Sequence, residues 1–101
     1  EFQEEQSEEH TMVRMDDFAE ILLYPNPGNG EMINLEIDGI ESGKVDVYLT
    51  DAMGKLLATK QYYVEGHLQT QWVFDTDLAF GLYMIEFVYD GKKVSQRIII
   101  E

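Results

Sequence analysis

The stretch Val45-Asp46-Val47-Tyr48-Leu49-Thr50-Asp51-Ala52-Met53-Gly54-Lys55 decides the fold class of this chain. Its first apolar residues alternate with polar ones, and this period of two is typical of a strand with one face in a core. The residues that follow suit a turn, because the Asp51 carboxylate can accept backbone N–H groups and Gly54 can adopt a positive φ. The stretch therefore predicts an antiparallel hairpin with strands over residues 44–50 and 55–63.

The same alternation recurs on both sides of this hairpin, between turns rich in glycine, aspartate and asparagine. Asp90-Gly91 predicts a two-residue hairpin turn, because both residues tolerate the positive φ that a type I′ turn requires. Pro25 and Pro27 end a strand at Tyr24, because proline lacks the N–H that a sheet needs. Seven strands are expected, over residues 21–24, 33–37, 44–50, 55–63, 70–74, 83–89 and 94–100. Seven short strands without a sustained helix predict an all-β fold, an antiparallel immunoglobulin-like β-sandwich, with a small barrel as the alternative.

Acidic residues dominate the first part of the 101-residue chain, whose net charge is −13. The first fifth of the chain holds eight of the 20 acidic residues and one of the seven basic ones, so it repels itself. We expect residues 1–20 to form a flexible acidic linker and residues 21–101 to form the folded domain. A short helix over residues 11–19 is the alternative, because apolar residues recur there at helical spacing. These residues are Met12, Met15, Phe18 and Leu22.

Charge and composition exclude several classes of protein. Nucleic acid is not expected as a partner, because duplex binding draws its affinity from basic residues and this chain is strongly acidic. Cysteine is absent, which excludes disulfides and thiolate metal sites. No apolar run approaches the roughly 20 residues that span a bilayer. The chain begins with Glu1 rather than methionine, so we expect a fragment of a longer polypeptide, and Glu1-Phe2 is compatible with a remnant of cloning.

Titratable side chains form no recognisable catalytic set. His10 and His67 lie in polar, loop-like segments, where a solvated histidine is expected. The carboxylate pairs Asp16-Asp17 and Asp75-Asp77 are expected to face water or form turns, since the Asp-x-Asp-x-Asp-Gly pattern of a calcium loop is absent. No catalytic, cofactor-binding or metal-ligating residue is assigned, so we do not expect an enzyme.

Aromatic residues raise a different hypothesis, a sugar-binding surface. Exposed aromatic rings stack on the apolar faces of sugars, and Tyr48 lies on the face opposite its apolar neighbours. Together with Tyr62 or Tyr63, Tyr48 is a candidate for such a surface. The alternative function is therefore an immunoglobulin-like carbohydrate-binding or adhesion module.

Four segments occur in an order that resembles a known family. They are Leu23-Tyr24-Pro25-Asn26-Pro27-Gly28-Asn29-Gly30, the stretch from Val45 to Lys55, Leu78-Ala79-Phe80-Gly81-Leu82-Tyr83, and the last strand after Gly91. Across residues 21–101 they resemble the type A C-terminal sorting domain of type IX secretion cargo, the Por secretion system family. The family motif residues are Tyr24, Pro25, Asn26, Pro27, Gly30, Asp51, Gly54, Gly81, Tyr83 and Gly91.

The resemblance implies a secretion signal. A cargo domain would precede it in the same chain, cross the inner membrane by an ordinary leader, and be passed outward by the type IX outer-membrane translocon. A sortase-like peptidase would cut in the flexible segment before Tyr24 and attach the cargo to lipopolysaccharide. The resemblance thus implies that the cargo is secreted or lies at the cell surface of a Gram-negative bacterium, after passing through periplasm and outer membrane.

Recognition is expected at the last strand. Family members often finish with a basic residue, and this chain keeps Lys92, Lys93 and Arg97 near its end, before Glu101. A chain that stops at the end of a strand also leaves backbone groups at a sheet edge, where a receptor could pair with them. We therefore expect the terminus to be an accessible handle.

Overall fold

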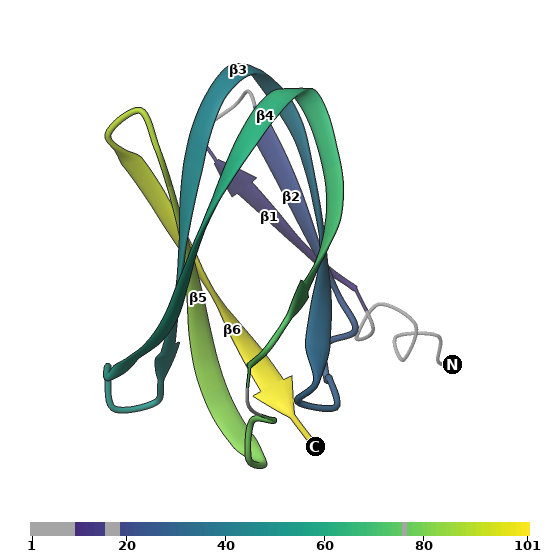
Figure 1. Cartoon of the computed structure of the whole chain (residues 1–101), viewed down its shortest axis with the longest axis vertical. Coiled ribbons are helices and arrows are strands. Elements are labelled where there is room, and N and C mark those ends of the chain that lie inside the picture. The colour runs from purple at the N-terminus through teal and green to yellow at the C-terminus, as the bar shows by residue number, and fades with distance from the viewer. Residues whose placement is uncertain (1–9, 16–18, 76) are drawn as a thin grey trace.

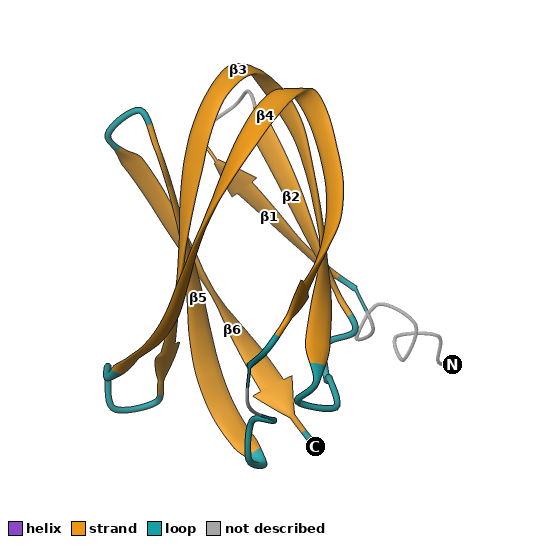
Figure 2. Ribbon diagram, viewed as in Figure 1, coloured by secondary structure: helices purple, strands orange, loops and turns teal. Residues whose placement is uncertain are grey.

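Six β-strands make up the computed structural model, which describes residues 10–15, 19–75 and 77–101. The predicted all-β, antiparallel class is confirmed, and the described residues contain no helix (Figures 1 and 2). The first two strands are short and the next two are long. Their bounds are β1 Thr11–Met15, β2 Ala19–Tyr24, β3 Met32–Asp51, β4 Leu56–Val73, β5 Gly81–Tyr89 and β6 Lys92–Ile100.

The strands β3 and β4 form one long hairpin that bends over the molecule as an arch (Figure 1). The bend lies where the β3–β4 register shifts after Asp38 and again after Ile40. Gly39 and Gly66 have φ of 96° and 83° there, a conformation that glycine adopts without strain. The prediction of seven strands is therefore wrong, because the strands predicted before and after this bend join into β3 and β4.

One edge of β3 pairs with β4, and the opposite edge is divided between two strands. Its first half pairs with β2 and its second half with β5, so the sheet order is β1-β2-β3-β5-β6 with β4 on the other edge of β3. Because β3 bends between these partners, the sheet curls into a nearly barrel-shaped structure around one core. An immunoglobulin-like sandwich of two separate sheets is not confirmed.

The core follows the predicted alternation. In the central hairpin, Val45, Val47 and Leu49 are buried and the residues between them are partly exposed. The bend adds one specific contact, between the ring of Tyr89 and the backbone of Gly43. A Cβ on Gly43 would lie 2.6 Å from Cε1 of Tyr89, so any larger residue there would displace this ring.

The first strand corrects the interpretation of residues 11–15 as part of a linker or a short helix. β1 pairs antiparallel with β2, and Val13 and Met15 are buried in the core. The helical spacing was misleading, because the side chains at 13 and 15 alternate as in a strand while Met12 is exposed. Residues 1–9, Asp16, Asp17 and Phe18 lie outside the described residues.

Candidate functional site at the C-terminal strand

The loop after β2 carries the Pro-Asn-Pro motif and lies against the end of β6. Tyr24 closes β2, where its hydroxyl donates to Oε2 of Glu36 at 2.7 Å and its ring stacks on His10 with centroids 4.8 Å apart. The chain then leaves the sheet at Pro25, and Asn26 reaches residues of the last strand that lie 71 and 73 positions further along the sequence. Figure 1 shows this loop and the C-terminus at the same end of the molecule.

Asn26 connects three segments through its side-chain amide. Its Nδ2 donates to Oγ1 of Thr11 at 2.8 Å and to the carbonyl of Arg97 at 3.2 Å. Its Oδ1 accepts the backbone N–H of Ile99 at 3.0 Å. The amide therefore pairs with β6 as another strand would, and it bridges β1 and β6, the two ends of the sheet order.

Gly28 continues this pairing with its backbone. Its N–H donates to the carbonyl of Ile99 at 2.7 Å, and its carbonyl accepts the N–H of Glu101 at 3.0 Å. We call the bonds of Asn26 and Gly28 to β6 the terminal clasp. The clasp corrects the expectation of an open edge, because the outward-facing backbone groups at the end of β6 are already bonded to the motif.

Gly30 lies where the motif loop, the loop before β5 and the last strand meet. A Cβ on Gly30 would lie 2.5 Å from the carbonyl oxygen of Leu78 and 3.1 Å from Cγ2 of Ile100. The Leu78 N–H donates to the carbonyl of Gly30 at 2.9 Å, which holds the two loops together. Ile100 is buried beneath this junction, with 4% of its surface exposed. The motif thus covers the last apolar side chain as well as the strand edge.

The other family motif residues lie outside the clasp, in turns or in β5. In the β3–β4 turn, Oδ1 of Asp51 accepts the N–H groups of Met53 and Lys55, both at 2.9 Å, and Gly54 has a φ of 90°. This confirms the predicted turn. Gly81 begins β5, and the hydroxyl of Tyr83 donates to the carbonyl of Ala79 at 2.7 Å.

The β5–β6 turn also has the predicted geometry. Asp90 and Gly91 have φ of 53° and 75°, so both central residues are in the left-handed region. In Figure 1 this turn lies at the end of the molecule opposite the C-terminus. Gly91 is therefore remote from the clasp.

The predicted recognition residues all lie on β6, but not on one face. Lys93 and Arg97 are on the outer face with Ile99, while Lys92 begins the strand opposite Tyr89. Nζ of Lys93 lies 3.8 Å from Oε2 of Glu86, and 70% of its side chain is exposed. Within the part of the chain that the structure describes, no ion pair of the Arg97 guanidinium is found.

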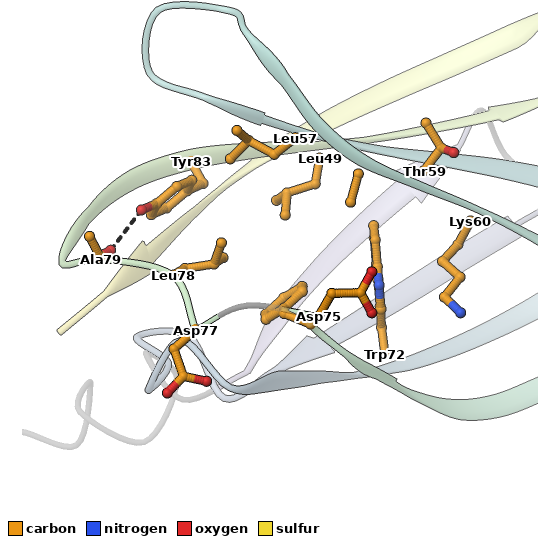
Figure 3. Close-up of a pocket in the computed structure, with 12 residues that line it drawn as sticks. Leu49, Leu57, Thr59, Lys60, Trp72, Asp75, Asp77, Leu78, Ala79 and Tyr83 are labelled. Carbon is orange, nitrogen blue, oxygen red and sulfur yellow. Dashed lines mark hydrogen bonds between the residues drawn. The ribbon is translucent and has the colours of Figure 1, made fainter.

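A pocket of about 450 Å³ opens beside β4, away from the clasp (Figure 3). Trp72 and Tyr83 line its inner part, and Lys60, Asp75 and Asp77 stand at its rim. The carboxylates of Asp75 and Asp77 point in different directions in Figure 3, and they belong to no group of three metal-ligating side chains among the described residues.

The remaining titratable candidates lie apart from one another. His67 is exposed at the bend of β4, with Nδ1 3.6 Å from Oδ1 of Asp38, whereas His10 stacks on Tyr24. The pair Asp16-Asp17 falls outside the described residues. His67 and the carboxylates of Glu20, Glu36 and Asp38 line one small hollow of about 100 Å³, but no set of the described side chains is arranged to hold a metal ion.

The candidate sugar-stacking tyrosines lie on both faces of the β3–β4 hairpin. Tyr62 pairs with the buried Val45 and so faces inward, whereas Tyr48 faces outward on β3. Burial raises the pKa of Tyr62, and its buried hydroxyl has no hydrogen-bond partner among the described residues. Tyr63 is 58% exposed and pairs with Lys44, so it lies on the same outer face as Tyr48, but four positions away along the hairpin. Trp72, at 2% exposure, offers no open ring face.

Sequence reasoning missed the roles of Thr11 and Asn26. Asparagine between two prolines signals a turn, but its partners are 15, 71 and 73 residues away, beyond any local pattern. The available signal was the position of the motif at a strand end, where a polar side chain can satisfy a neighbouring edge.

The fold and the clasp together define an all-β module whose last strand is held by its own glycine-rich motif. The chain belongs to the family of secretion system C-terminal sorting domains, whose model matches residues 22–101. The resemblance seen in the sequence is thereby confirmed. Comparison with curated proteins and with solved structures found no match. Among the described residues, no helix is long and apolar enough to span a membrane.

Membership of this family gives the chain a role in type IX secretion. A sorting domain of this kind implies an interaction with the secretion machinery, a cargo domain upstream, and a secreted or cell-surface destination for that cargo.

Proposed function

We propose that the chain is a non-catalytic signal that directs its cargo across the outer membrane and is recognised as a folded unit at β6. The observation that carries this proposal is the terminal clasp, because it joins the family motif around Asn26 to the terminal strand. A signal read only as an extended peptide would need no such bonds. The clasp instead fixes the position of Arg97 relative to the body of the domain, and pairing with β5 holds Lys93.

The strands upstream of Tyr24 restrict where a sortase-like peptidase would cut. Residues 11–15 and 19–24 pair in β1 and β2, and a peptidase needs an extended, accessible segment. We place the scissile bond before Thr11 rather than directly before Tyr24. After cleavage the cargo would be coupled to lipopolysaccharide, since the acidic domain itself has no electrostatic attraction to an anionic outer leaflet.

A reporter fusion tests the proposed function. The full chain is fused behind a reporter with a periplasmic leader, in a host with a type IX system, and a host lacking its translocon is the control. The full chain is used because β1 contributes Val13 and Met15 to the core. We expect the reporter outside the cell in the first host only. A reporter that stays in the periplasm of both hosts would contradict the proposal.

Mass spectrometry of the exported reporter tests the position of the cut. We expect its C-terminus to fall before Thr11. A C-terminus between residues 19 and 24 would show that β2 is opened before cleavage.

The carbohydrate-binding alternative receives no support from the geometry. Its candidates were Tyr48 with Tyr62 or Tyr63. Tyr62 faces inward, and Tyr48 and Tyr63 share the outer face but lie four positions apart, about 13 Å along the strands, so their rings do not form one flat stacking surface. Glycan binding that disappears in Tyr48→Ala, with folding intact, would revive it.

A further inference from the structure

The terminal clasp covers only part of the outer edge of β6. The carbonyl of Arg97 and both backbone groups of Ile99 point away from β5, because they bond to Asn26 and Gly28. In an antiparallel ladder the direction of the backbone groups alternates, so those of Lys93 and Ser95 point the same way. The clasp ends at Arg97, and no described strand pairs with the edge upstream of it, although β1 lies near β6.

Nothing in the described structure pairs with that upstream part. β6 pairs only with β5 in the sheet, and no hydrogen bond to the backbone of Lys93 or Ser95 is found on the outer side within the described residues. Ser95 is exposed. We call the outward backbone groups of residues 93 and 95 and the Arg97 N–H the free edge.

The side chains beside the free edge are basic, although the chain is acidic overall. β6 carries three of the seven basic residues of a chain with a net charge of −13. Lys93 and Arg97 lie four positions apart on the outer face, with Ser95 between them. Arg97 has no ion pair within the described part of the chain, and the Lys93–Glu86 pair is long at 3.8 Å. These two cations can therefore accept carboxylates from outside.

We propose that the export receptor adds an extended acidic segment to the free edge of β6 as a short additional strand. This inference rests on the proposed function and names the surface through which it acts. Backbone pairing would set the register of the incoming strand. Two carboxylates four positions apart on that strand would then lie directly opposite Lys93 and Arg97, within the distance at which cross-strand side chains interact. The clasp sets one end of this pairing at Arg97.

The long outer edge of β4 is a weaker candidate for the same partner. β4 pairs only with β3, but its edge bends at Gly66 and holds one lysine, Lys60, among its 18 residues. A bent edge offers a poorer template for pairing. The free edge of β6 is short, straight beyond its turn, and basic.

Two substitutions at one position separate backbone pairing from side-chain contact. Ser95→Pro removes an outward N–H and keeps the ladder with β5, because proline is tolerated at edge positions that do not donate to the sheet. Ser95→Ala removes the hydroxyl and keeps the N–H. In the reporter fusion we expect export to fall at least tenfold with Ser95→Pro and to stay within twofold of the parent with Ser95→Ala.

The outcomes distinguish this inference from the proposed function. If the parent chain is not exported, the proposed function fails. If the parent and Ser95→Pro are exported equally, strand addition at the free edge is overturned while the function stands. Loss of export with both variants would assign recognition to the serine side chain, and this result would also overturn strand addition at the free edge.

A charge reversal keeps the inference testable if Ser95→Pro lowers the melting temperature. The double variant Lys93→Glu with Arg97→Glu is compared with Lys55→Glu and Lys60→Glu, which change the net charge equally but lie in the β3–β4 turn and on β4. We expect the β6 pair to lose at least tenfold in export and the control pair to lose less than twofold. Equal export of the two double variants would overturn the inference.

Discussion

The side-chain oxygen of Asn26 accepts the backbone N–H of Ile99 at 3.0 Å, across 73 positions of sequence. One amide thus takes the place that a neighbouring strand would occupy beside β6. The amide nitrogen of the same side chain donates to the carbonyl of Arg97 and to the hydroxyl of Thr11, so Asn26 is bonded to both β6 and β1. The family motif acts as a structural bond between the start and the end of the domain.

Asn26→Ala should destabilise the domain by about 1–3 kcal/mol, because it removes three hydrogen bonds that each contribute about 0.5–1 kcal/mol. Urea unfolding measures the loss. Asn29→Ala is a matched control in the same loop, since its Oδ1 accepts only the exposed N–H of Glu31 and should contribute about 0.5 kcal/mol. The amide of Ile99 should also exchange its hydrogen faster in Asn26→Ala. Equal losses in the two variants would contradict the role of the clasp.

Gly30→Ala should cost about 3 kcal/mol or more, because a Cβ there meets the Leu78 carbonyl at 2.5 Å in addition to the strain of a positive φ. Gly54→Ala is the control. Its φ is 90° against 86° for Gly30, but no atom lies within 4 Å of an added Cβ. It should therefore cost only about 1 kcal/mol from backbone strain. Thermal unfolding measures the loss of stability in both variants. Equal losses in Gly30→Ala and Gly54→Ala would refute this explanation.

Tyr62→Phe should leave stability within about 1 kcal/mol of the parent at pH 7, because the buried hydroxyl has no partner to lose. The two proteins should diverge at high pH. Burial raises the folded-state pKa of Tyr62 above 10.0, so above that pH the folded state retains a proton that the unfolded state releases. The stability of the parent should then fall as pH rises, more steeply than that of Tyr62→Phe. Melting temperatures between pH 8 and 11 check this, and parallel curves would contradict it.

Lys93→Ala with Arg97→Ala should reduce export without changing the melting curve. Both side chains are on the outer face, and an exposed ion pair such as Lys93 with Glu86 contributes under about 0.5 kcal/mol. Ile98→Ala serves as the contrast, since Ile98 is 1% exposed and its truncation should cost about 2–4 kcal/mol. Export at the parent level in the double alanine variant would move recognition away from these two cations.

Local patterns were sufficient for the class of fold and for two of its turns. The alternation around Val45 places one face of β3 in the core, and the turns at Asp51 and Asp90 follow from residues that accept backbone N–H groups or positive φ. The family motif was visible in the sequence as well. These features depend on neighbours along the chain, so they can be read from the order of residues.

Only the tertiary structure showed what the motif does and how many strands there are. The alternations before and after Gly39 appear as separate strands in sequence, but a bulged strand can continue through the bend while β4 pairs along its whole length. β1 forms because β2 offers it an edge, which its acidic surroundings concealed. The bonds from Asn26 to Arg97 and Ile99 exist because curling of the sheet brings the two strand edges together, and no local preference encodes that closure.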